Sequence, residues 1–182
     1  MKNYLLFNTV TSTIHASIMF LLSVLNISNS TLICGLKFSA LYNIFDMIIM
    51  KKSKIRNQML FHHSLLVIAA VYGILYPQKK ILEIIQLGYI TEITTPFLNI
   101  AWYYNLKKNK TKLDEKIMFT SSIITFILYL PCRVLLTTYI SFKVQHIECS
   151  VKSIVYLFTL LNYMWYYKMC RKFRLMMIEV NV

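Results

Sequence analysis

Six long apolar stretches follow one another along this chain, and they constrain its fold more than any other feature. Each is close to the roughly 20 residues that an α-helix needs to cross about 30 Å of hydrocarbon. They cover residues 4–27, 31–50, 59–77, 81–104, 117–141 and 151–169. Only helices and closed barrels satisfy their backbone groups in lipid, and these stretches lack the alternation of barrel strands. The sequence therefore predicts an all-α polytopic membrane protein, a bundle of about six transmembrane helices.

The composition agrees with this interpretation. Hydrophobic residues make up 57% of the 182 residues and charged residues 15%, which is too apolar for a soluble domain of this size. No soluble segment, linker or internal repeat separates the stretches. We therefore expect residues 1–182 to form a single membrane domain.

The net charge of +13 comes from lysines and arginines that lie between the apolar stretches. This pattern is typical of membrane topology and of contact with anionic headgroups, so nucleic acid is not expected as a partner. Fourteen basic residues lie on one predicted side, in the N-terminus, the 51–56 and 107–116 connections and the 168–174 tail, and four lie on the other. Because basic loops favour the cytosol, we expect both termini to be cytosolic.

Two adjacent histidines, His62 and His63, stand inside the third apolar stretch, just after a basic connection. Ionisable groups at membrane depth are costly and are commonly retained for function. Asp46 precedes the same connection by little more than one helical turn, so we expect it at the level of the histidines. One histidine could act as nucleophile or base while a carboxylate such as Asp46 orients the other. The alternative is that both only form hydrogen bonds between helices.

Polar residues also recur three or four positions apart in other stretches, which places them on one helix face. Such stripes occur in the second stretch (Gly35, Ser39, Tyr42, Asp46), the fourth (Gly88, Glu92, Thr95, Asn99) and the fifth (Ser122, Tyr129, Arg133, Thr137). These faces should point inward, away from lipid. We expect an intramembrane cavity lined by His15, Tyr42, Thr95, Asn99 and Arg133.

Glu92 and Arg133 are charged residues of two different stretches. The interpretation we favour is a buried ion pair that holds two helices in register, and the other is that Glu92 acts as an acid or base. Pro96 should kink the fourth helix beside Glu92, because proline removes one backbone hydrogen bond. Trp102 and Trp165 are expected to anchor helix ends at the membrane interface.

The cysteines and histidines give little indication of a metal. The four cysteines form no C-x-x-C pair, and His146 with Cys149 are two residues in a short loop. We expect neither a metal nor a cofactor.

Several of these motifs together resemble the TLC-domain family, which includes the ceramide synthases and the translocating-chain-associated membrane proteins. The resemblance rests on residues 12–16, 42–46, 62–63, 91–99, Trp102, Arg133 and 161–169. It is closest to the small TLC-domain-containing proteins. It implies a multi-pass protein of the endoplasmic reticulum or a related internal membrane that binds, senses or organises membrane lipid in an intramembrane cavity.

The resemblance also implies two alternative functions. One is a ceramide-synthase-like N-acyltransferase, in which His62 or His63 carries an acyl group from acyl-CoA to a long-chain amine. Asp46 would orient that histidine and Glu92 would be a second acid or base, although the aspartate-rich motif that follows in ceramide synthases is replaced here around Glu92. The other is a translocon-associated, chaperone-like protein. Membrane lipids are the expected partners, a homodimer is compatible with the sequence, and no protein partner is indicated.

Overall fold

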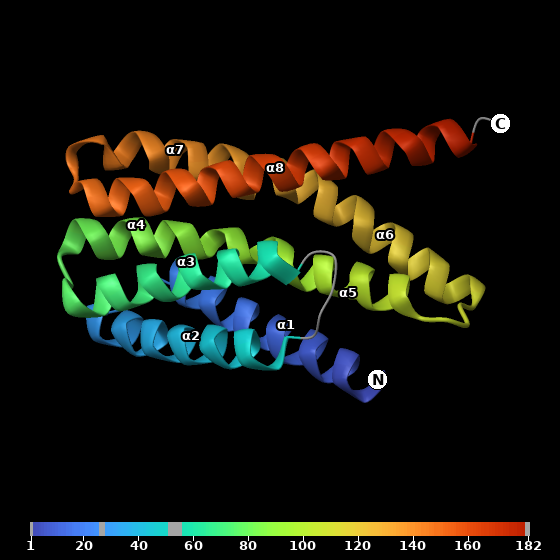
Figure 1. Ribbon diagram of the computed structural model, residues 1–182, viewed down its shortest axis with the longest axis horizontal. Helices are drawn as coiled ribbons and strands as arrows, with labels where there is room; N and C mark the ends of the chain where they lie inside the picture. Colours follow the sequence, from blue (N-terminus) through green and yellow to red (C-terminus); the bar gives the residue numbers. More distant parts are fainter. Residues whose placement is uncertain (1, 26–27, 51–55, 181–182) are drawn as a thin grey trace.

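The described residues form an all-helical bundle without a β-strand (Figure 1). A computed structural model describes residues 2–25, 28–50 and 56–180, so Lys51, Lys52 and Lys54 of the basic connection lie outside the described residues. The helices are α1 (Lys2–Val24), α2 (Asn29–Ile49), α3 (Arg56–Leu75), α4 (Lys79–Ile90), α5 (Thr95–Leu106), α6 (Lys112–Tyr129), α7 (Leu136–Lys143) and α8 (Cys149–Val180). The predicted all-α polytopic bundle is confirmed, since α4 continues into α5 and α6 into α7.

Four helical segments of the described chain are long and apolar enough to cross a membrane. They are Leu6–Val24, Asn29–Ile49, Arg56–Leu75 and Lys112–His146. Large apolar side chains on these segments face outward, as the exposed Leu41, Ile48 and Leu75 illustrate. An outer surface of this kind suits lipid rather than water, so the chain is an integral membrane protein.

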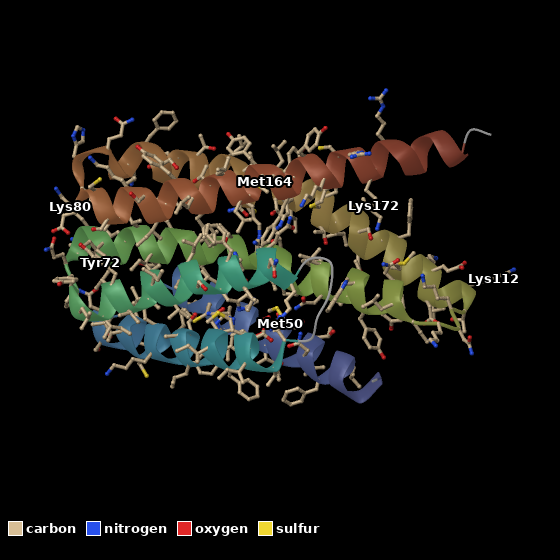
Figure 2. The ribbon with its side chains drawn as sticks, viewed as in Figure 1. Met50, Tyr72, Lys80, Lys112, Met164 and Lys172 are labelled. Atoms are coloured by element: carbon tan, nitrogen blue, oxygen red, sulfur yellow. The ribbon has the colours of Figure 1, made fainter. Side chains whose placement is uncertain are left out.

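Successive long helices run antiparallel, where α4 with α5 and α6 with α7 each count as one long helix (Figure 1). Contacts join α2 to α3, α5 to α6 and α7 to α8, while α1 packs against α2, α4 and α5. Figure 1 shows the starts of α2, α4 and α8 gathered at one end of the bundle. At the other end the α5–α6 hairpin and the C-terminal half of α8 extend away from each other. Figure 2 shows Tyr72 and Lys80 at the first end and Lys112 at the second.

Two of the long helices, α4–α5 and α6–α7, are interrupted in the middle by a different helical geometry. Thr91–Thr94 forms a 3-10 turn between α4 and α5, and Pro96 lies in the first turn of α5. Leu130–Leu135 forms a π-helix between α6 and α7, with Pro131 in its first turn. Because proline cannot donate a backbone hydrogen bond, both changes fall where the α-helical ladder is weakened. We expected the first interruption beside Pro96 and did not anticipate the second.

A hydrophobic core joins α1, α2, α3 and α4. Met19, Leu36, Ala70 and Leu82 are among its buried residues. Gly73 of α3 permits this close packing, because a Cβ atom there would lie 2.5 Å from Cδ1 of Ile85. The core holds these four helices together beside the polar residues that form the candidate site.

Candidate functional site

Asp46 on α2 and His63 on α3 are in direct contact. The Oδ2 atom of Asp46 lies 3.4 Å from Nε2 of His63, and both side chains are buried. Because α2 and α3 are consecutive and antiparallel, a residue near the end of α2 meets a residue near the start of α3. The carboxylate therefore fixes the orientation of the His63 ring.

His62 faces α8 instead, because neighbouring residues on a helix point about 100° apart. The centroid of its ring lies 5.1 Å from that of Phe158 and 5.2 Å from that of Trp165. The indole N–H of Trp165 also donates a hydrogen bond to Gln58 on α3. Trp165 therefore contacts His62, whereas the sequence suggested only a membrane-interface anchor.

Buried polar atoms without a hydrogen-bond partner gather around these residues. Within the described part of the chain they include Oδ1 of Asn43, Oδ1 of Asp46 and the Nδ1 atoms of His62 and His63. We name these four residues the histidine cluster. Each unpaired buried polar atom costs roughly 1–3 kcal/mol, so several in one place need an explanation. A polar ligand that hydrogen-bonds to them is one that fits.

His15 of α1 belongs to a hydrogen-bonded group next to the histidine cluster. Its Nε2 atom lies 3.0 Å from Oγ of Ser39, which accepts hydrogen bonds from the Tyr89 hydroxyl at 2.8 Å and the Asn43 amide at 3.2 Å. Those two bonds occupy both lone pairs of Ser39, so its own proton is donated to His15. The His15 ring stacks on Tyr42, with centroids 4.0 Å apart. Helices α1, α2 and α4 are thereby joined.

Glu92 and Arg133 are ion-paired where the 3-10 turn and the π-helix face each other. Nη2 of Arg133 lies 3.8 Å from Oε1 of Glu92, and both side chains are buried. Arg133 also donates to the hydroxyls of Thr94 at 2.6 Å and Thr95 at 2.7 Å. The Thr95 hydroxyl in turn donates to Glu92 at 2.7 Å. Thr94 was missed in the sequence, because it lies off the predicted polar stripe.

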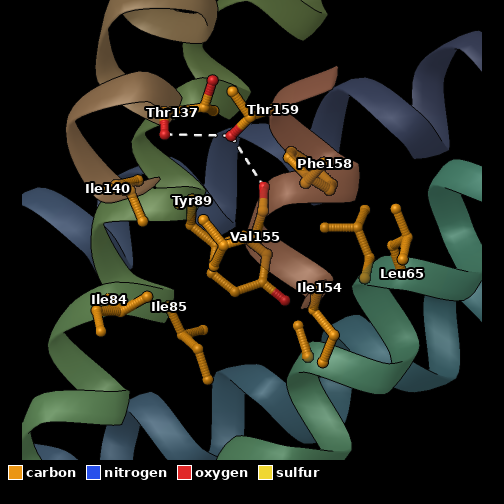
Figure 3. Close-up of a pocket in the computed structure, with 13 residues that line it drawn as sticks. Leu65, Ile84, Ile85, Tyr89, Thr137, Ile140, Ile154, Val155, Phe158 and Thr159 are labelled. Carbon is orange, nitrogen blue, oxygen red and sulfur yellow. Dashed lines mark hydrogen bonds between the residues drawn. The ribbon is translucent and has the colours of Figure 1, made fainter. Parts of the chain in front are cut away.

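An apolar cavity of about 80 Å³ lies between α3, α4, α7 and α8 (Figure 3). Its lining includes Leu65, Ile84, Ile140 and Val155. The hydroxyl of Thr159 donates to the backbone carbonyls of Thr137 and Val155, so this polar group is satisfied at the cavity wall (Figure 3). The interior therefore suits hydrocarbon better than water.

Two residues of the cavity wall also contact polar residues of the site. Tyr89 lines it and also donates its hydroxyl proton to Ser39, while Phe158 lines it and packs against His62. The apolar cavity and the polar residues of the site therefore adjoin each other through the side chains of Tyr89 and Phe158.

The five residues that we expected to line a cavity do not line this one. His15 and Tyr42 stack on each other, and Thr95 and Arg133 surround Glu92. The amide of Asn99 donates to the hydroxyls of Ser12 and Thr13 on α1, at 3.0 Å and 3.1 Å. Gly88 and Thr137 of the predicted stripes do line the apolar cavity. Its aliphatic residues were missed because in sequence they resemble lipid-facing ones.

The fold and these contacts define a class: a polytopic helical membrane protein that encloses ionisable residues between its helices. Among the described residues, no group of three or more His, Cys, Asp or Glu side chains could hold a metal ion. The family model of the TLC domain matches residues 6–171, and the chain belongs to the TLC-domain family. The predicted resemblance is confirmed. Comparison with curated proteins and with solved structures gives no match.

Proposed function

We propose that the protein binds one membrane lipid, with its polar head at the histidine cluster and a hydrocarbon chain in the apolar cavity. The observation that carries this proposal is that two residues belong both to the cavity lining and to the surroundings of the polar site. Tyr89 and Phe158 line the cavity and also contact the polar residues beside it. An amphiphile needs this combination of apolar lining and a few convergent polar groups.

The unpaired atoms favour a particular kind of head. Oδ1 of Asn43 and Oδ1 of Asp46 can only accept hydrogen bonds, and each imidazole Nδ1 can accept or donate according to its tautomer. The guanidinium of Arg133 is engaged by Glu92, Thr94 and Thr95. A head with hydroxyl, amine or amide donors therefore fits the histidine cluster better than a phosphate does.

Tryptophan fluorescence can test this binding. The chain has two tryptophans, so Trp102→Phe leaves Trp165, which packs on His62, as the sole emitter. The protein is reconstituted in phosphatidylcholine vesicles with increasing amounts of a brominated lipid. A brominated long-chain amide with a hydroxylated head should quench Trp165 saturably, whereas brominated phosphatidylcholine should quench it weakly and without saturation. Equal, non-saturable quenching by both lipids would overturn the proposal.

A substitution at Gly88 separates occupation of the cavity from general contact with lipid. Gly88 lines the apolar cavity, and a Cβ atom there would meet nothing within 4 Å. Gly88→Leu should fill the space and abolish saturable quenching of Trp165, while Gly88→Ala should weaken it only partly. Unchanged quenching in Gly88→Leu would place the lipid elsewhere.

A second candidate function is supported by the contact between His63 and Asp46. A histidine oriented by a carboxylate is a common arrangement for a nucleophile or base. The His63 imidazole would take the acyl group of an acyl-CoA thioester and release CoA as the thiol. A long-chain amine would then take the acyl group, form an amide and restore the imidazole. The proton lost by the amine balances the one taken by the thiolate.

Activity separates this candidate from binding alone. Purified protein given acyl-CoA and a long-chain amine should release free CoA and form the amide, and His63→Ala should abolish both. Absence of turnover in protein whose Trp165 is still saturably quenched would exclude the acyltransferase and leave lipid binding standing.

A further inference from the structure

A second pocket, of about 300 Å³, lies between α5, α6 and the C-terminal part of α8, away from the residues of the histidine cluster. Aromatic and sulfur-containing residues make up almost half of its lining, with Trp102, Phe119, Phe126, Met169 and Phe173 among them. Phe126 and Phe173 stack with their ring centroids 4.9 Å apart, which joins α6 to α8 at the pocket wall.

The charge at this pocket is positive. Lys172 is its one charged lining residue within the described chain, and its side chain is exposed. Figure 2 shows Lys172 on the part of α8 that extends past the rest of the bundle. The same part of α8 carries Lys168, Arg171 and Arg174, and no acidic residue occurs between positions 149 and 178. We name this the basic pocket.

The depth of the basic pocket follows from helix geometry. Helix α4 begins at Lys79 and helix α8 begins at Cys149, and both starts lie at the same end of the bundle (Figure 1). Trp102 lies 23 residues after Lys79, and Lys172 lies 23 residues after Cys149. At about 1.5 Å per residue, both are about 35 Å from that end. The hydrocarbon core of a bilayer is about 30 Å thick, so both residues reach the level of the opposite headgroups.

We infer that the basic pocket binds an anionic phospholipid, with its phosphate against Lys172 and the first part of an acyl chain among Trp102, Phe126 and Phe173. Lysine ammonium and phosphate have opposite charge at the same depth, and the aromatic walls accept the adjoining methylenes. This site is distinct from the apolar cavity, which lies between α3, α4, α7 and α8. The chemistry of the two sites also differs, since the histidine cluster offers acceptors and the basic pocket offers a cation.

Trp102 makes the inference testable. Trp165→Phe leaves Trp102 as the sole tryptophan, and Trp102 lines the basic pocket. The protein is reconstituted in phosphatidylcholine vesicles with a small fraction of phosphatidylglycerol or phosphatidylcholine, brominated in the part of the chain nearest the glycerol. Brominated phosphatidylglycerol should quench Trp102 at lower mole fraction than brominated phosphatidylcholine does. Equal quenching by the two lipids would overturn the inference.

Neighbouring cations on the same helix supply the control. In Lys172→Gln, the preference for brominated phosphatidylglycerol over brominated phosphatidylcholine in quenching Trp102 should fall about fivefold, because one interfacial lysine is lost. Lys172→Arg keeps the charge and should retain the preference. Arg171→Gln removes an equal charge that does not line the pocket and should change the preference by less than about twofold. An equal loss in Lys172→Gln and Arg171→Gln would mean general surface attraction and would overturn the inference. Circular dichroism checks that every variant remains helical.

Discussion

Oδ2 of Asp46 and Nε2 of His63 lie 3.4 Å apart, on two antiparallel helices. Because Nε2 faces the carboxylate, Nδ1 is the nitrogen of His63 that remains for a ligand. Oδ1 of Asp46 is likewise without a partner in the described chain. The contact therefore orients two unpaired atoms and leaves both able to bind the head of a lipid.

Asp46→Asn should weaken lipid binding while preserving the shape of the site. The change removes a charged acceptor, and hydrogen bonds to charged groups contribute about 1.5–3 kcal/mol. We expect the half-saturating fraction of the brominated amide lipid at Trp165 to rise at least about tenfold. Glu148→Gln is the control, because Glu148 accepts a hydrogen bond from Tyr72 at the other end of the bundle. An unchanged half-saturating fraction in Asp46→Asn would contradict a role for this carboxylate.

Arg133 and Glu92 should show strong non-additivity in a double-mutant cycle. Arg133→Met leaves the buried Glu92 carboxylate without its partner, which should lower the free energy of unfolding by about 3–5 kcal/mol. Adding Glu92→Gln should recover part of that loss, because the unpaired charge is removed. Denaturant unfolding in detergent micelles measures the free energy of unfolding of Arg133→Met, of Glu92→Gln and of the double variant. Additive losses would show that the two side chains do not depend on each other.

Two glycines should respond in opposite ways to alanine. A Cβ atom at Gly73 would lie 2.5 Å from Cδ1 of Ile85 and 3.0 Å from Cδ1 of Leu36, whereas one at Gly88 would meet nothing within 4 Å. Gly73→Ala should therefore lower the free energy of unfolding by about 1–3 kcal/mol. Gly88→Ala should raise it by about 0.5–1 kcal/mol, because alanine restricts the unfolded chain and fills empty space. Thermal unfolding of the two variants in one detergent compares them, and equal shifts would contradict the packing described.

The all-α fold could be predicted from the sequence, since runs of about 20 apolar residues leave a chain few other choices in lipid. The level of Asp46 relative to His63 followed from their distances to one basic connection. The direction of Trp165 did not, because an aromatic residue near a helix end suits both an interface anchor and a ring contact with His62. The π-helix at Pro131 was also missed, since one proline does not specify how the backbone accommodates it.

The apolar cavity could not be placed from the sequence for a different reason. Leu65, Ile84 and Val155 come from three helices, and they face one another only once those helices pack. Periodicity indicates which face of one helix is polar but not how three aliphatic faces fit together. The three- and four-residue spacing placed Gly88 and Thr137 on inward-facing stripes, but it did not predict that they line a cavity.

A final prediction concerns pH and the connection between α5 and α6. The ammonium of Lys107 donates a hydrogen bond of 2.6 Å to Asp114, and this bond raises the pKa of Lys107 above its usual value of about 10.5. A lysine whose pKa is higher in the folded protein than in the unfolded chain stabilises the folded state fully at pH values below its unfolded-state pKa. That stabilisation is lost as the pH rises through the folded-state pKa. The difference in free energy of unfolding between the unsubstituted protein and Lys107→Gln should therefore be constant from neutral pH to about pH 9 and disappear above the raised pKa. Lys108→Gln removes the neighbouring exposed lysine and should show no such step. A difference that grows with pH would contradict the contribution of the bond between Lys107 and Asp114.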